Sequence, residues 1–79
     1  MGALDKTDIQ LREKISKRIT ALRKATGKNQ SAFSKEAQID RQTQNRWEKG
    51  RGATIYTINK LCIEIGITLK EFFDDPMFK

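Results

Sequence analysis

The chain has 79 residues, enough for one small domain near the lower size limit for a stable single core. Its hydrophobic fraction is 37%, and 16 basic against ten acidic side chains give a net charge of +6. One cysteine and no histidine exclude an internal disulfide and leave too few ligands for a zinc site, and no apolar run approaches the roughly 20 residues that span a bilayer. We therefore expect a soluble cytoplasmic protein without a metal or another cofactor.

The basic side chains are concentrated in the first three quarters of the chain. Residues 1–60 contain 14 of the 16 Lys and Arg residues but only six of the ten acidic ones, whereas residues 61–79 are net negative. A polyanion is the natural partner of such a surface. Charge alone does not separate this interpretation from an ordinary solvated face.

Apolar side chains recur at helical spacing over residues 8–25 and would form one stripe: Leu11, Ile15, Ile19 and Leu22. Thr7 or Asp8 can cap the start of this helix, and Gly27 ends it. Asn29 then caps a short helix over residues 30–37, and Asp40 caps a third over residues 41–49.

A fourth helix is expected over residues 54–65, where Gly66 ends it, and Thr68 with Glu71 forms a capping box for a fifth over residues 69–74. These five helices and their short connections leave no room for a strand. We expect an all-α domain over residues 8–75, preceded by a flexible segment at residues 1–7 and followed by a tail at residues 76–79.

The second and third helices are joined by so few residues that they must cross steeply, as in a helix-turn-helix. The third helix would then enter the major groove of DNA, where Arg, Gln and Asn match the donors and acceptors of base edges. Four side chains are candidates for base contacts: Arg41, Gln42, Asn45 and Arg46. Five are candidates for phosphate contacts: Asn29, Gln30, Thr43, Lys49 and Arg51.

The stretch NQSAFSKEAQIDRQTQNRWEKG, residues 29–50, resembles the helix-turn-helix of the Cro and C1 repressor family, also called XRE-like. The resemblance extends over residues 9–75 and implies a compact, five-helix, lambda-repressor-like fold. It also implies double-stranded DNA, with a palindromic operator, as the partner of a homodimer. By the same resemblance the protein would be a bacterial or phage-encoded, nucleoid-associated repressor.

Two residues depart from the family pattern. Gln38 stands where the family has a glycine, so a left-handed backbone there would cost about 1 kcal/mol. Gln44 stands at an expected apolar core position, where an unsatisfied amide would cost about 1–3 kcal/mol. Either the Gln44 amide bonds to neighbouring backbone or the helix is slightly rotated.

Several residues have a structural interpretation. Trp47 is expected in the core rather than stacked on a base, and Cys62 is expected to be a small buried hydrophobe. The resemblance implies that Glu48 pairs with Arg23 instead of facing DNA. The apolar side chains near the C-terminus either close the core or contact a second copy of the chain: Leu69, Phe72, Phe73, Met77 and Phe78.

The sequence contains no catalytic constellation, because histidine is absent and no serine has an evident base nearby, so we expect no enzymatic activity. Three functions remain. The first is a sequence-specific transcriptional regulator; the second is a DNA-binding antitoxin whose main partner is a toxin protein; the third is a helix-turn-helix used only for protein contact.

Overall fold

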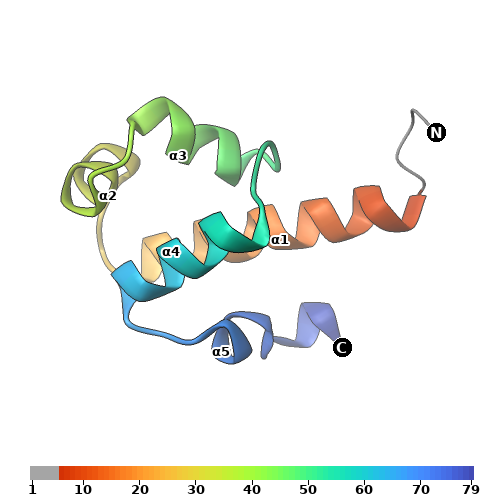
Figure 1. The fold of residues 1–79 in the computed structure, drawn as a ribbon. Coiled ribbons are helices and arrows are strands. Elements are labelled where there is room, and N and C mark those ends of the chain that lie inside the picture. The colour runs from red at the N-terminus through yellow and green to blue at the C-terminus, as the bar shows by residue number, and fades with distance from the viewer. Residues whose placement is uncertain (1–5) are drawn as a thin grey trace.

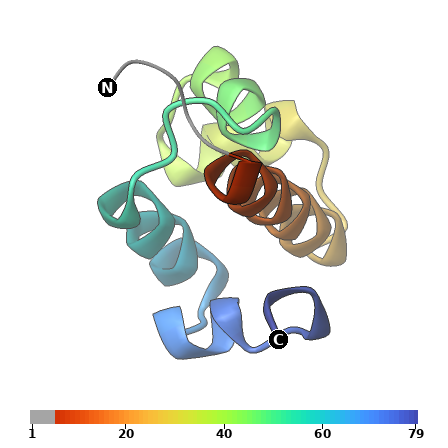
Figure 2. The same cartoon turned by 90° about the vertical axis from the view of Figure 1, so that its right-hand side faces the viewer.

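The computed structural model describes residues 6–79. This part of the chain forms α-helices and no β-strand, which confirms the predicted all-α class: α1 (Lys6–Ala25), α2 (Gln30–Ala37), α3 (Arg41–Glu48), α4 (Ile55–Ile65) and α5 (Leu69–Phe73), followed by the 3-10 helix η1 (Pro76–Phe78). α2 and α3 lie on one side of α1 and α4, and α5 with η1 lies on the other (Figures 1 and 2). Within the described residues no helix is both long and apolar enough to cross a membrane.

Side-chain caps start three of the helices, and the sequence predicts two of these caps, Asn29 and Thr68. Asn29 Oδ1 accepts from the Ala32 N–H at 2.8 Å, and Thr54 and Thr68 each form a capping box at the start of α4 and α5. Asp40 precedes α3 with an extended backbone, but its side chain makes no capping hydrogen bond, so this part of the prediction was wrong.

The structure differs from the predicted organisation at both ends of the chain. Residues 1–5 of the expected flexible segment lie outside the described residues, whereas Lys6 and Thr7 belong to α1, which therefore begins before the proposed caps. The expected tail contains η1, and the Phe78 ring packs against Phe73 with 5.1 Å between ring centroids. Both differences lengthen the ordered part of the domain.

The core contains apolar side chains from α1 to α5: Ile19, Phe33, Trp47, Ile58, Leu61, Cys62 and Phe72. Burial raises the pKa of the Cys62 thiol, as expected for a cysteine that acts as a small hydrophobe. Leu11 was expected in the apolar stripe of α1, but it is 46% exposed. The first turns of α1 extend past the body of the domain, where no helix covers them (Figure 1).

Arg18 connects α1 to the C-terminal part of the chain. Its Nε donates to the Phe72 carbonyl at 2.7 Å and its Nη2 to the Glu71 carbonyl at 3.0 Å, while Nη1 lies 3.2 Å from Asp75 Oδ2. One guanidinium therefore donates to two carbonyl groups at the C-terminal end of α5, the end at which a helix has fewer N–H groups than carbonyl groups to pair. These bonds hold α5 and η1 against α1.

We predict that Arg18→Ala destabilises the domain by about 1.5–3 kcal/mol, the usual range for hydrogen bonds to a charged group. Lys17→Ala is the matched control, because Lys17 is an exposed neighbour on the same helix and should change stability by less than about 0.5 kcal/mol. Urea unfolding followed by circular dichroism measures both variants. Equal stabilities would show that Arg18 does not hold the C-terminal segment.

Candidate nucleic-acid interface

A tight turn at Gln38 sets the steep crossing of α2 and α3 (Figure 1). Gln38 has φ 58° and ψ 41°, which is the left-handed conformation that the glycine of the family pattern would adopt. The Ile39 N–H donates to the Ser34 carbonyl at 2.9 Å and closes the end of α2. The chain thus keeps the helix-turn-helix backbone, at a cost of roughly 1 kcal/mol for a side chain in this conformation.

The first turns of α3 bring together three of the four candidates for base contacts. Arg41, Gln42 and Asn45 line a hollow of about 470 Å³ with Gln30 and Asp40. Donors and acceptors of several kinds therefore converge on one concave surface at the start of the helix.

Arg46, the fourth candidate, does not line this hollow. Its Nη2 would lie 3.5 Å from a Cβ atom added at Gly52, so the guanidinium extends toward the loop after α3. Which neighbours a long side chain reaches depends on the direction of that side chain as well as on its spacing along the helix.

Four of the five candidates for phosphate contacts form two groups, one near each end of α3. Asn29, Gln30 and Ser31 line a hollow at the start of α2 together with Arg23 and Arg41. A helix N-terminus presents backbone N–H groups and a partial positive charge, which suits an anion. Ser31 was missed by the sequence analysis, although its place in the first turn of α2 was predicted.

At the other end of α3, Lys49 and Arg51 share a hollow with Arg12 of α1. Arg12 was not selected from the sequence, because only the packing of α1 against the end of α3 shows which of its basic residues lies there. Thr43 is half-buried and lines neither of the two groups.

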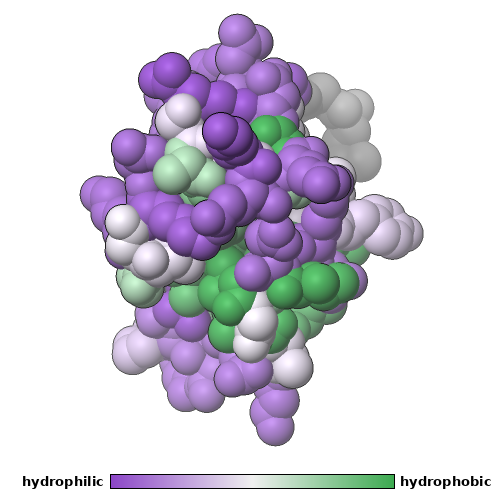
Figure 3. All heavy atoms as spheres, turned by 90° about the vertical axis from the view of Figure 1, so that its left-hand side faces the viewer, coloured by the Kyte–Doolittle hydropathy of each residue, from purple (hydrophilic) through white to green (hydrophobic). Residues whose placement is uncertain are grey.

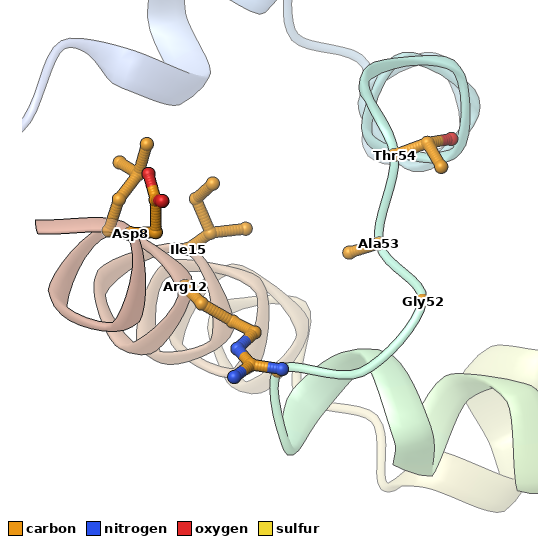
Figure 4. Close-up of a pocket in the computed structure, with 8 residues that line it drawn as sticks. Asp8, Arg12, Ile15, Gly52, Ala53 and Thr54 are labelled. Carbon is orange, nitrogen blue, oxygen red and sulfur yellow. The ribbon is translucent and has the colours of Figure 1, made fainter. Parts of the chain in front are cut away.

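Arg12 also borders a second hollow, of about 350 Å³, between α1 and the segment 50–54. Figure 4 shows its side chain extending from α1 toward the loop that follows α3, whereas Ile15 lies farther along α1. Gly50 permits this approach, because an added Cβ would lie 3.1 Å from Arg12 Cγ and the backbone φ is +79°. The loop after α3 is thereby held close to α1.

The expected ion pair between Arg23 and Glu48 is present and nearly buried. Arg23 Nε lies 2.8 Å from Glu48 Oε2, Nη2 donates to Oε1 at 3.1 Å, and the side chains are 9% and 5% exposed. Arg23 Nη1 also donates to the Lys28 carbonyl at 2.7 Å, at the connection before α2. The guanidinium thus connects α1, this connection and α3.

Glu48 accepts two further hydrogen bonds. Gln44 Nε2 donates to Oε2 at 2.7 Å, and Gln30 Nε2 donates to Oε1 at 3.2 Å. Each oxygen then accepts two bonds, which fills the acceptor capacity of a carboxylate. Burial raises the pKa of Glu48, but the hydrogen bonds from Arg23, Gln44 and Gln30 outweigh it and leave that pKa below its ordinary value.

Gln44 is fully buried, as its core position predicts, but its hydrogen-bond partner differs from the expected backbone. Its amide bonds to the Glu48 side chain one turn later and not to neighbouring backbone. Its Oε1 atom is buried and has no hydrogen-bond partner among the described residues. Trp47 is 7% exposed and lies in the core, as predicted.

A family model described as helix-turn-helix, of the Cro/C1 type, matches residues 19–72, more than half of the chain. The chain belongs to this helix-turn-helix family. No curated protein and no solved structure gives a significant match. Membership makes the chain a DNA-binding helix-turn-helix regulator in the general sense, and the matched residues include the turn and the whole of α3.

Part of the predicted dimer contact of this family member is not accessible. Phe72 is 0% exposed and packs in the core, so it cannot contact a second copy and its inclusion was wrong. The other members of the predicted set are half-buried: Leu69, Phe73, Met77 and Phe78. Core closure and a dimer contact are therefore both compatible with this segment.

A separate apolar hollow lies between α2 and α4. Ala37, Ile39 and Leu61 line it, and Ile63 beside them is 71% exposed. Figure 3 shows apolar side chains gathered on this face among hydrophilic ones. The candidates for base contacts do not line this hollow, so it forms no part of the candidate interface.

The buried ion pair predicts an acid-dependent loss of stability. Because the folded-state pKa of Glu48 lies below its ordinary value of 4.5, ionisation favours the folded state above that pH, and the benefit is lost as the pH falls through the folded-state pKa. Glu48→Gln should destabilise the domain at pH 7 by about 3–5 kcal/mol and weaken its acid dependence.

Urea unfolding between pH 3 and pH 7 measures this effect. Glu64→Gln is the control, because Glu64 is an exposed carboxylate on α4 that should leave the pH dependence nearly unchanged. A Glu48→Gln variant with the wild-type dependence on pH would contradict the assignment.

Proposed function

We propose that the protein is a sequence-specific, repressor-like transcriptional regulator that places α3 in the major groove of double-stranded DNA. The observation that supports this function is the hollow at the start of α3. There, Arg41, Gln42 and Asn45 present groups that match the major-groove edges of bases.

The two groups of candidates for phosphate contacts, one near each end of α3, support the same placement. α3 has eight residues, and a rise of 1.5 Å per residue makes it about 12 Å long. The major groove is also about 12 Å wide, so contacts at both ends of the helix would reach the phosphates that border the groove. The start of α2 supplies one contact, and Lys49 and Arg51 supply the other.

We further propose that the protein binds a palindromic operator as a homodimer. One module of this size covers only half of a typical site, and the half-sites of helix-turn-helix dimers lie about 34 Å apart. The half-buried side chains Leu69, Phe73, Met77 and Phe78 are the candidate contact. Selection of bound sequences from random duplex DNA at near-physiological salt tests both points, because the expected result is a palindromic consensus. Enrichment of no sequence would favour the use of the module for protein contact only.

Two kinds of contact should separate under mutation. Arg41→Ala or Gln42→Ala should weaken binding by about 1–3 kcal/mol and relax the preference at particular base pairs, because a base-contacting group is lost. Lys49→Ala should instead weaken binding to all sequences alike and reduce the salt slope by about one unit, because a phosphate contact is lost.

Affinities for cognate and scrambled duplexes at several salt concentrations distinguish these effects. Lys70→Ala is the charge-matched control, since Lys70 is exposed on α5, on the opposite side of α1 from α3 (Figure 1). If Arg41→Ala and Gln42→Ala weaken cognate and scrambled binding equally, the start of α3 does not contact bases.

The dimer contact has its own test. Met77→Glu places a charge in the candidate contact and should reduce affinity for a full operator by at least tenfold while leaving affinity for an isolated half-site within about twofold. The half-site serves as an internal control for DNA contact and for folding. Equal losses on both duplexes would mean that another surface forms the dimer.

A further inference from the structure

A chain of hydrogen bonds leads from the core of the domain to the surface of α3. It begins at the buried carboxylate of Glu48, where Gln30 Nε2 donates to Oε1 at 3.2 Å. The same Gln30 nitrogen donates to Asn45 Oδ1, also at 3.2 Å. One amide group of α2 thus connects a structural carboxylate to a candidate for base contact.

The hydrogen bond from Gln30 to Glu48 fixes the direction of the hydrogen bond between Gln30 and Asn45. An ionised carboxylate only accepts hydrogen bonds, and Arg23 keeps Glu48 paired with a positive charge. If the Gln30 amide were rotated by half a turn, its oxygen would face a carboxylate oxygen, so the NH2 group must face Glu48. The same NH2 group of Gln30 faces the Asn45 amide. Within that amide only the oxygen can accept a hydrogen bond from it.

The orientation of Asn45 has a consequence for base recognition. Asn45 Oδ1 faces Gln30, so the Asn45 NH2 group points away from Gln30. It lies in the hollow that Arg41 and Gln42 also line. An asparagine free to rotate matches adenine, which presents the N7 acceptor beside the N6 donor. An asparagine that only donates matches guanine better, because guanine presents two adjacent acceptors, N7 and O6.

We propose that Gln30 determines specificity by fixing the Asn45 amide as a donor, so that Asn45 selects guanine over adenine in the operator. This inference rests on the proposed function, since it concerns the base pair that α3 contacts. It also assigns Gln30 a positioning role in place of the phosphate contact that its sequence position suggests.

Sequence selection with variants tests the inference. Asn45→Ala first identifies the base pair that depends on Asn45, because the preference at that position should disappear. The wild-type protein should select guanine there. Gln30→Leu should reduce the preference for guanine over adenine at this position by about tenfold and leave the other positions unchanged. A tenfold change corresponds to about 1.4 kcal/mol.

Gln44→Leu is the matched control. It removes another donor from the same carboxylate, and Gln44 has no contact with Asn45 in the hydrogen-bond chain. It should therefore leave the base preference unchanged, and circular dichroism checks that each variant is folded.

A second measurement uses only the wild-type protein. Replacing the selected guanine with 7-deazaguanine removes the N7 acceptor, and 6-thioguanine replaces O6 with a weakly accepting sulfur while it keeps the N1–H that pairs with cytosine. Each substitution should weaken binding by about three- to tenfold if the Asn45 NH2 group donates to both atoms.

The outcomes separate the inference from the proposed function. Three outcomes would overturn the role of Gln30: selection of adenine at the position that depends on Asn45, the absence of such a position, or an unchanged base preference in Gln30→Leu. In each case a selected consensus would still support DNA recognition. Failure of the wild-type protein to enrich any sequence would overturn the proposed function itself.

Discussion

The carboxylate of Glu48 holds the helix-turn-helix in place, because it accepts hydrogen bonds from three helices at once. Arg23 approaches from α1, Gln30 from α2 and Gln44 from α3 itself. A buried carboxylate requires this number of donors, since removal from water deprives both of its oxygens of hydrogen bonds. The relative positions of α1, α2 and α3 are therefore coupled through one side chain.

Such a buried pair is weak evidence for stability as such, because desolvation of the two charges offsets much of their attraction. The effect of the ion pair on the orientation of neighbouring side chains is clearer. The bidentate geometry of Arg23 fixes where Glu48 lies, and the remaining acceptor positions then specify where Gln30 and Gln44 donate. Arg18 has a comparable role at the other side of α1, where it fixes α5 through carbonyl groups.

Local signals in the sequence predicted most of the fold but less of the site. Asn29, Thr54 and Thr68 marked helix starts within one residue, because caps act over a few neighbouring positions. The same reasoning did not reveal that Phe72 is fully buried, or that Arg46 does not line the hollow formed by Arg41, Gln42 and Asn45. Helical spacing tells which residues share a face, but the depth of packing and the direction of a long side chain depend on neighbours distant in sequence.

Gln44 illustrates how the structure accommodates one departure from the family pattern. An apolar residue at this core position would avoid the unsatisfied Oε1 atom, which costs about 1–3 kcal/mol, but would leave Glu48 one donor short. With Gln44 present, Oε2 accepts from Arg23 and Gln44, so the remaining acceptor position of the carboxylate is on Oε1, facing Gln30. A polar residue in the core thereby supplies the second hydrogen bond to Oε2, while Gln30 separately supplies the second hydrogen bond to Oε1.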